Sequence, residues 1–202
     1  MSAAMPGATR RREVRVRTFD TADGEFFVAI ERCGDRERLV ETGWTSLRSP
    51  LPSAWRRDPR VAPELVARLR RALRGESVDF SDVELPEASP FFARCRRAVQ
   101  RVPAGTTVSY GDLARRAGNG AASRAAGQAM RRNPTPIVVP CHRVIASTGA
   151  VGGFAGAWAT ASGPACPQTE LKTRLIERER ACAASVAGTT NGRRGRSFAR
   201  SF

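Results

Sequence analysis

The chain has 202 residues, enough for a sizeable core in one domain or two small ones. Its 34 lysines and arginines against 19 aspartates and glutamates give a net charge of +15, which favours a polyanionic partner, above all nucleic acid. No signal peptide or long apolar segment is visible and the five cysteines are irregularly spaced, which argues against a secreted, membrane-spanning or disulfide-linked protein.

The first half of the chain predicts a small α/β domain over residues 14–85. Residues 1–13 are small, polar and basic, and predict a disordered start. Apolar residues then alternate with charged ones and lead into the turn at Asp23-Gly24, which predicts a β-hairpin. A further strand is expected around residues 39–44.

A loop, a helix and a linker are expected next. Residues 48–60 are rich in proline and arginine, which is typical of a loop. Pro63 opens a helix in which apolar residues recur at helical spacing until Gly75 ends it. Residues 76–90 carry acidic residues and two prolines, and predict the linker to a second unit.

The second half predicts a mainly helical domain over residues 86–182, with helices at 91–102, 111–118 and 121–132. The last two flank a turn at Asn119-Gly120 and form a helix-turn-helix pattern, whose second helix enters a DNA groove. The alternative is that a helix pair with alanine-rich faces serves only packing. Charge favours DNA binding, because the stretch 94–143 holds ten arginines and one acidic residue.

The stretch Pro140-Cys141-His142-Arg143-Val144 is the candidate reactive site. It places the chain's only histidine and an arginine beside a cysteine, and an adjacent imidazole or cation lowers the pKa of a thiol toward the reactive thiolate. A cysteine in an apolar run is usually an inert core residue, but here prolines bracket the run and charged residues follow it. One histidine and no Cys-x-x-Cys pair leave no clustered metal ligands, so we expect no metal and no cofactor.

With these motifs the sequence resembles the O6-alkylguanine-DNA alkyltransferases, the methylated-DNA–protein-cysteine methyltransferases. The similarity runs from about Phe91 to Val151, through Pro-Ala-Gly-Thr-Thr-Val-Ser-Tyr-Gly-Asp-Leu-Ala, Arg-Ala-Ala-Gly-Gln-Ala-Met, Asn-Pro-Thr-Pro and the highly specific Pro-Cys-His-Arg-Val. Residues 14–85 resemble the family's smaller N-terminal domain only loosely. The resemblance implies an α/β N-terminal domain, a small sheet plus a helix, followed by a mainly α C-terminal domain with a helix-turn-helix of winged-helix type.

The resemblance also implies catalytic roles. Cys141 is the acceptor that attacks the alkyl carbon on guanine O6, and His142 takes the thiol proton through a water molecule. A carboxylate orients His142. Glu179 keeps the family's spacing from Lys172, and Glu177 is the competing choice on a different helical face.

Further residues are implied to bind DNA and the damaged base. Asn133 ties the helix-turn-helix to the active-site strand, Tyr110 assists at the guanine and its phosphate, and Arg124 fills the gap left by the flipped base. Without the resemblance they would be a helix stop, a core tyrosine and a solvated arginine. The implied DNA-binding set is Tyr110, Arg124, Ala125, Ala126, Gly127 and Arg131. The implied alkylguanine pocket is Val144, Ser147, Phe154 and Gly156, with backbone groups of residues 149–156 reading the guanine edge.

The sequence departs from the family in two places. Phe154 stands where the family more usually has tyrosine, which removes a hydroxyl and keeps a stacking or packing surface. Residues 159–170, rich in small residues and proline, intervene before the pattern resumes at Lys172. The tail over 183–202 predicts a basic disordered segment that attracts phosphate non-specifically.

The sequence therefore predicts a single-turnover DNA repair enzyme, a monomer located in the cytoplasm and at the nucleoid. It moves a methyl or other alkyl group from O6 of guanine in duplex DNA, with O4 of thymine as a second candidate, to Cys141. The alternative is a non-enzymatic sensor that flips alkylguanine and recruits other repair factors, and the presence of Cys141 argues against it. A cysteine hydrolase would need an oxyanion hole, which nothing in the sequence marks.

Overall fold

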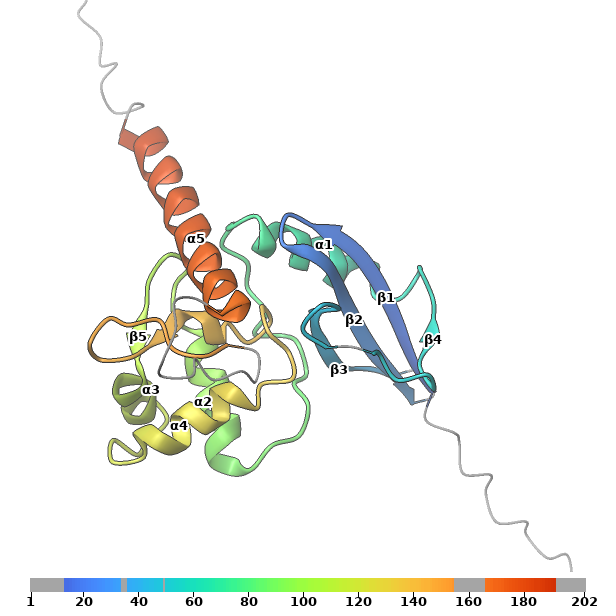
Figure 1. Ribbon diagram of the computed structural model, residues 1–202, viewed down its shortest axis with the longest axis horizontal. Helices are drawn as coiled ribbons and strands as arrows, with labels where there is room; N and C mark the ends of the chain where they lie inside the picture. Colours follow the sequence, from blue (N-terminus) through green and yellow to red (C-terminus); the bar gives the residue numbers. More distant parts are fainter. Residues whose placement is uncertain (1–12, 34–35, 49, 155–165, 192–202) are drawn as a thin grey trace, which may run out of the picture.

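The computed structural model describes residues 13–33, 36–48, 50–154 and 166–191. Its N-terminal region is a four-stranded sheet built on the predicted hairpin (Figure 1). The strands are β1 (Glu13–Thr21), β2 (Gly24–Cys33), β3 (Arg36–Trp44) and β4 (Arg56–Arg57), in the order β3-β2-β1-β4. The antiparallel pairing of β1 with β2, and of β2 with β3, confirms the hairpin and the third strand.

Strand β4 lies in residues 48–60, which were predicted to be a loop, so that prediction is wrong at Arg56 and Arg57. Its two arginines pair in parallel with Arg15 and Val16 of β1. A strand of two residues has no alternation of apolar and polar side chains to reveal it. Its pairing depends on where β1 lies, which local sequence does not state.

The alternation along β2 gives the sheet two apolar faces. Phe26, Val28 and Ile30 belong to the main core, the large buried cluster to which both halves of the chain contribute. Phe27 and Ala29 belong to a smaller cluster. The sheet is therefore covered on both sides.

Helix α1 (Pro63–Leu73) confirms the predicted helix and contributes Val66, Leu69 and Leu73 to the main core. Gly75 follows with φ +91°, a conformation that side chains rarely adopt. A Cβ at this position would lie 2.6 Å from the backbone oxygen of Arg178. Gly75 therefore follows the end of α1 and lets the backbone at Arg178, which is distant in sequence, come into contact with it.

The C-terminal region is mainly helical (Figure 1). Its helices are α2 (Pro90–Gln100), α3 (Tyr110–Arg116), α4 (Ser123–Arg131) and α5 (Pro167–Asn191), and the short strands β5 (Val108–Ser109) and β6 (Val144–Ile145) pair in parallel. The three predicted helices are confirmed as α2, α3 and α4, with ends shifted by one or two residues. A capping box between Ser109 and Asp112 fixes the start of α3.

Helix α5 corrects two expectations about the end of the chain. It begins at Pro167, inside the segment 159–170 that was expected to interrupt the pattern, and it continues to Asn191. The predicted disordered tail from residue 183 is therefore helical as far as Asn191, because the alanine-rich stretch after Cys182 can continue a helix. Residues 1–12 and 192–202, also predicted to be disordered, lie outside the described residues. Among the helices that are described, none is long and apolar enough to cross a membrane.

The segment that carries Cys141 is a turn, so the expectation of an active-site strand is wrong. Residues Cys141–Arg143 form a 3₁₀-helix, η1. The backbone N–H of Cys141 donates to Val139 over 2.8 Å, and that of Arg143 donates to Pro140 over 2.9 Å. These two short-range bonds bend the chain where an extended strand would have continued.

The two regions share the main core, which is one continuous cluster of buried residues. Trp44 of β3 packs edge-on against Phe154, with ring centroids 6.0 Å apart. Thr42 donates from its backbone to Pro134 over 3.0 Å and from its hydroxyl to Pro136 over 2.7 Å. The sheet edge is thereby joined to the loop that leads to Cys141.

Candidate active site

Asn133 anchors the loop that delivers the cysteine. Its side-chain oxygen accepts hydrogen bonds from the backbone N–H and the hydroxyl of Thr135, over 3.1 Å and 3.3 Å. Its Nδ2 donates to the Val139 carbonyl over 2.9 Å and to Cys141 Sγ over 3.3 Å. One side chain therefore holds the beginning of the loop, its end and the thiol.

Ile137, in the middle of this loop, has an unusual backbone conformation. Its φ is 75°, a value that a β-branched residue rarely adopts. Such a residue costs about 1–3 kcal/mol of folding free energy and persists only where the surroundings hold it. Ile137 is buried in the main core, which supplies that restraint.

Cys141 is buried, with 5% of its surface exposed. Burial raises the pKa of its thiol, although the Asn133 hydrogen bond and the charge of Lys172 act in the opposite direction. The net shift is upward, so the adjacent His142 and Arg143 do not make the resting thiol a thiolate. Both side chains bind a carboxylate elsewhere, and the loss of water dominates.

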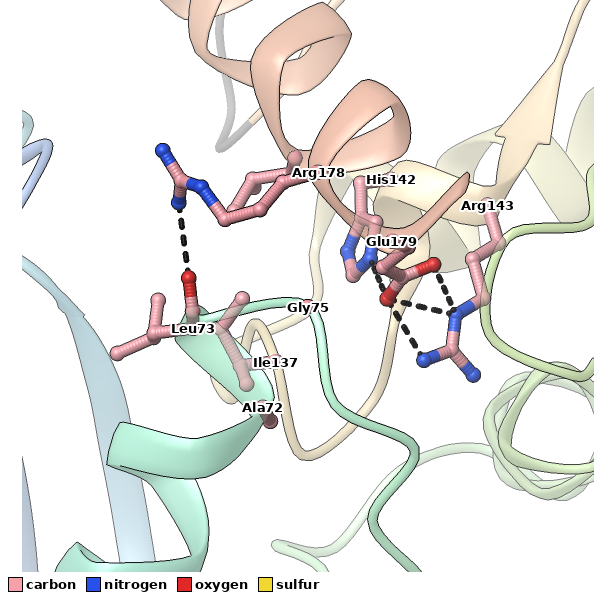
Figure 2. Close-up of a pocket in the computed structure, with 9 residues that line it drawn as sticks. Ala72, Leu73, Gly75, Ile137, His142, Arg143, Arg178 and Glu179 are labelled. Carbon is pink, nitrogen blue, oxygen red and sulfur yellow. Dashed lines mark hydrogen bonds and ion pairs between the residues drawn. The ribbon is translucent and has the colours of Figure 1, made fainter. Parts of the chain in front are cut away.

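That carboxylate is Glu179 of α5 (Figure 2). His142 Nε2 lies 2.8 Å from Glu179 Oε1. Arg143 donates from Nε to both carboxylate oxygens over 3.1 Å and from Nη2 to Oε1 over 2.7 Å. Glu177, the competing choice, is exposed, because two residues along a helix point to different sides.

The electrostatics of this cluster assign its protons. Burial alone would raise the pKa of Glu179, but hydrogen bonds and charges from His142 and Arg143 lower it to about 2. Burial lowers the pKa of His142, against the opposing effect of Glu179. At neutral pH the pair is therefore a carboxylate and a neutral imidazole that donates from Nε2. No group among the described residues hydrogen-bonds the buried Nδ1, so its lone pair can accept a proton.

Lys172 belongs to the site, although no role was predicted for it from the sequence. It is 1% exposed, and its Nζ donates to the Val144 carbonyl over 2.6 Å. Burial lowers the pKa of Lys172 to about 8, while the charge of an ionised Cys141 raises it. The available signal was compositional: it is the only lysine in a chain whose other basic residues are arginines and one histidine.

Tyr110, the first residue of α3, lies close to two other segments. A Cβ at Gly127 of α4 would lie 3.8 Å from its ring, and a Cβ at Gly152 would lie 3.7 Å from its hydroxyl oxygen. Burial, and then the charge of Cys141, raises the pKa of Tyr110. The hydroxyl therefore keeps its proton at neutral pH.

The residues of α4 predicted to bind DNA fall on two faces. Arg124 in the first turn and Arg131 in the last turn are exposed, and Ala125 and Gly127 are half-buried. Ala126 is fully buried in the main core, so its assignment to the DNA-binding set is wrong. It lies on the apolar stripe that packs α4 against the rest of the protein.

The described residues of the predicted alkylguanine pocket differ in their exposure. Val144 is buried and its carbonyl is already bonded to Lys172, whereas Ser147 is exposed. Phe154 is buried against the N-terminal sheet, so it serves as a core residue and offers no open stacking surface. Gly156 lies outside the described residues.

Several known proteins and solved structures are similar to this chain. A family model described as 6-O-methylguanine DNA methyltransferase, DNA binding domain, matches residues 90–181. The constitutive methylated-DNA–protein-cysteine methyltransferase of Bacillus subtilis is 32% identical over 164 residues, which cover 81% of this chain and 93% of that protein. A methylated-DNA–protein-cysteine methyltransferase of Mycolicibacterium paratuberculosis is 42% identical over 108 residues, which cover 53% and 65%. The crystal structure of Mycobacterium tuberculosis OGT in complex with DNA matches with a TM-score of 0.66 at 30% identity, covering 83% of this chain and 93% of that one. The chain therefore belongs to the methylated-DNA–protein-cysteine methyltransferase family.

Proposed function

We propose that this protein repairs DNA by moving an alkyl group, chiefly methyl, from O6 of guanine to Cys141. The observation that carries the proposal is the array of Asn133, Cys141, His142 and Glu179, which places a base and its charge partner beside a buried thiol. Family membership supports it, since the relatives are named for methyl transfer from DNA to a protein cysteine.

In the proposed reaction, a sulfur–carbon bond forms while the bond between the alkyl carbon and guanine O6 breaks. The thiol proton passes to Nδ1 of His142 through a water molecule, and Glu179 compensates the charge of the imidazolium. A base is needed because the thiol keeps its proton in the resting site. The charge of Lys172 stabilises the thiolate as it forms.

The departing guanine takes the electron pair of the broken bond and needs a proton or a strong hydrogen bond. We assign this role to Tyr110, whose pKa is raised by burial, so its hydroxyl is a donor at neutral pH. Guanine takes the proton of the Tyr110 hydroxyl and leaves as the ordinary base, and the sulfur becomes a thioether. The proton taken from the thiol by His142 then returns through solvent to the Tyr110 oxygen, whose raised pKa favours the protonated form. A thioether is stable and no described group is placed to reverse it, so each molecule acts once.

Helices α3 and α4 are proposed as a helix-turn-helix that carries the protein onto duplex DNA. The exposed Arg124 and Arg131 at the two ends of α4 support this role, and the half-buried Gly127 lies beside the Tyr110 ring. Because guanine O6 takes part in base pairing, the nucleotide must be extruded, and Arg124 would fill the space it leaves.

The protein is proposed to act as a monomer, associated with the nucleoid because its substrate is there. Residues 14–85 and 86–182 are proposed as its two domains, although their buried residues form a single core.

Mass spectrometry after incubation with duplex DNA containing O6-methylguanine tests the proposal. One added methyl on Cys141, and none on the Cys141→Ala protein, is the expected result. DNA affinity should be almost unchanged in the Cys141→Ala protein, because the arginines bind and the thiol reacts. Binding without any modification would indicate the sensor alternative, and demethylated DNA with an unmodified protein would indicate a hydrolase.

A further inference from the structure

Arg178 is the neighbour of Glu179 on α5, but its side chain extends toward the N-terminal region. Its Nη1 donates to Asp23 Oδ2 over 2.7 Å, and its Nη2 donates to Oδ1 over 3.2 Å. Asp23 lies in the turn between β1 and β2, and its side chain is only 2% exposed. Arg174, one helical turn earlier, donates to the same carboxylate over 3.1 Å from a more exposed position.

The same guanidinium also contacts the end of α1. Arg178 Nη1 donates to the Leu73 carbonyl over 2.8 Å, a bond visible in Figure 2. The absence of a side chain at Gly75 allows the backbone of Arg178 to approach, since a Cβ there would lie 2.6 Å from its oxygen. Three segments that are distant in sequence therefore meet at one arginine: the hairpin turn, the end of α1 and α5.

This junction borders the catalytic cluster. A small cavity lies between them and is lined by residues of both, among them Leu73, Gly75, His142, Arg178 and Glu179 (Figure 2). Adjacent residues of a helix move together, so a shift of α5 at Arg178 would move Glu179 by a similar amount. A displacement of about 1 Å at a catalytic group can cost about 10²-fold in rate.

We propose that Asp23 and Arg178 form a positioning pair that holds α5 against the hairpin turn and α1, and thereby keeps Glu179 within hydrogen-bond distance of His142. The inference rests on the proposed function, because its measurable effect is on alkyl transfer. Within the described part of the chain, the side-chain hydrogen bonds of the two residues join them to each other, to Arg174 and to Leu73, and not to the thiol. The N-terminal sheet thus contributes to the reaction without contributing a group to the active site.

The first test measures the rate at which Cys141 reacts with free O6-benzylguanine, a substrate that removes DNA binding from the comparison. Asp23→Asn and Arg178→Gln should each slow the reaction about tenfold or more and move the rising limb of the pH–rate profile to higher pH. Arg178→Lys, which keeps the cation, should recover part of the rate. Arg180→Gln removes the same charge from an exposed position on the same helix and should react like the wild type.

A second test separates positioning from general destabilisation. In the Glu179→Gln background, adding Arg178→Gln should not slow the reaction further, because the residue through which Arg178 acts is already lost. The melting temperature should still fall by the same amount as in the wild-type background. If Arg178→Gln does not fold, the rates of the Asp23→Asn and Arg178→Lys proteins decide the question.

Wild-type rates in the folded Asp23→Asn and Arg178→Gln proteins would overturn the inference. So would an equal loss of rate from Arg178→Gln with and without Glu179. A wild-type protein that fails to alkylate Cys141 would instead refute the proposed function, so the two failures are distinguishable.

Discussion

At the scale of single residues, the surroundings of Cys141 have opposing effects on the pKa of its thiol. Burial holds the proton on the sulfur, while the Asn133 hydrogen bond and the charge of Lys172 make its removal easier. A protonated, buried thiol reacts slowly with oxidants and stray electrophiles. The arrangement suits the proposed function, in which the cysteine is used only once and reacts when a substrate is bound and His142 takes the proton.

Glu179 provides the sharpest test of the cluster, and Glu177 is its matched control. Glu179→Gln should lower the transfer rate by about 10²-fold or more, because the imidazolium loses its compensating charge. It should also raise the apparent pKa of Cys141, measured as the pH dependence of alkylation. Glu177→Gln changes the same chemical group at an exposed position and should have little effect. A larger loss of rate in Glu177→Gln than in Glu179→Gln would show that Glu177, and not Glu179, contacts His142.

The same carboxylate predicts a defined response to acid. Its pKa is about 2 in the folded protein against an ordinary value of 4.5, so its contribution to stability is complete above about pH 4.5 and is lost as the pH falls toward 2. Urea unfolding at a series of pH values should therefore show a steeper loss of stability over this window in the wild type than in Glu179→Gln. Parallel curves would mean that folding does not lower the pKa of this carboxyl.

At the scale of elements, the helices and strands that could be predicted from the sequence are those with a local periodic pattern of apolar residues. Helices α1 to α4 and the β1–β2 hairpin could be predicted because their apolar spacing and turn residues are local. The 3₁₀-turn at Cys141 could not, because the run Ile137-Val138-Val139 resembles a strand and only tertiary packing holds Ile137 at its positive φ. The same limit applies to Lys172 and Ala126, whose roles depend on which way their helices face.

Arg124 lies exposed in the first turn of α4. Arg124→Ala should slow repair of duplex DNA much more than the reaction with free O6-benzylguanine, because only the duplex has a base to extrude. Arg71→Ala, at an exposed arginine of α1, is the control and should leave the ratio of the two rates unchanged. Equal losses on both substrates would place Arg124 in the pocket or in folding.

At the scale of the whole molecule, the net charge of +15 is distributed unevenly along the chain. Residues 183–191 contain no charged residue, whereas residues 192–202 contain four arginines. The first segment belongs to α5 and the second lies beyond the described residues. Truncation can therefore separate the contribution of the end of α5 from that of the four arginines that follow it.

Two truncations test the contribution of this charge to DNA binding. Removing residues 192–202 should flatten the dependence of log affinity on log salt by about 0.9 for each arginine that holds a phosphate. Removing residues 183–202 deletes the same four arginines and should give the same slope, with an additional loss of thermal stability from the shortened α5. Neither truncation should change the rate of transfer at saturating DNA. An unchanged salt slope would show that the tail does not contact DNA.

The burial of Lys172 has a practical consequence for protein chemistry. Since the chain has no other lysine, its only side-chain amine is almost inaccessible in the folded state. Amine-reactive labels should therefore modify Lys172 only when α5 detaches and exposes it. The rate of acylation of Lys172, measured by peptide mapping, would therefore report how often α5 detaches from the active site, without any residue being substituted.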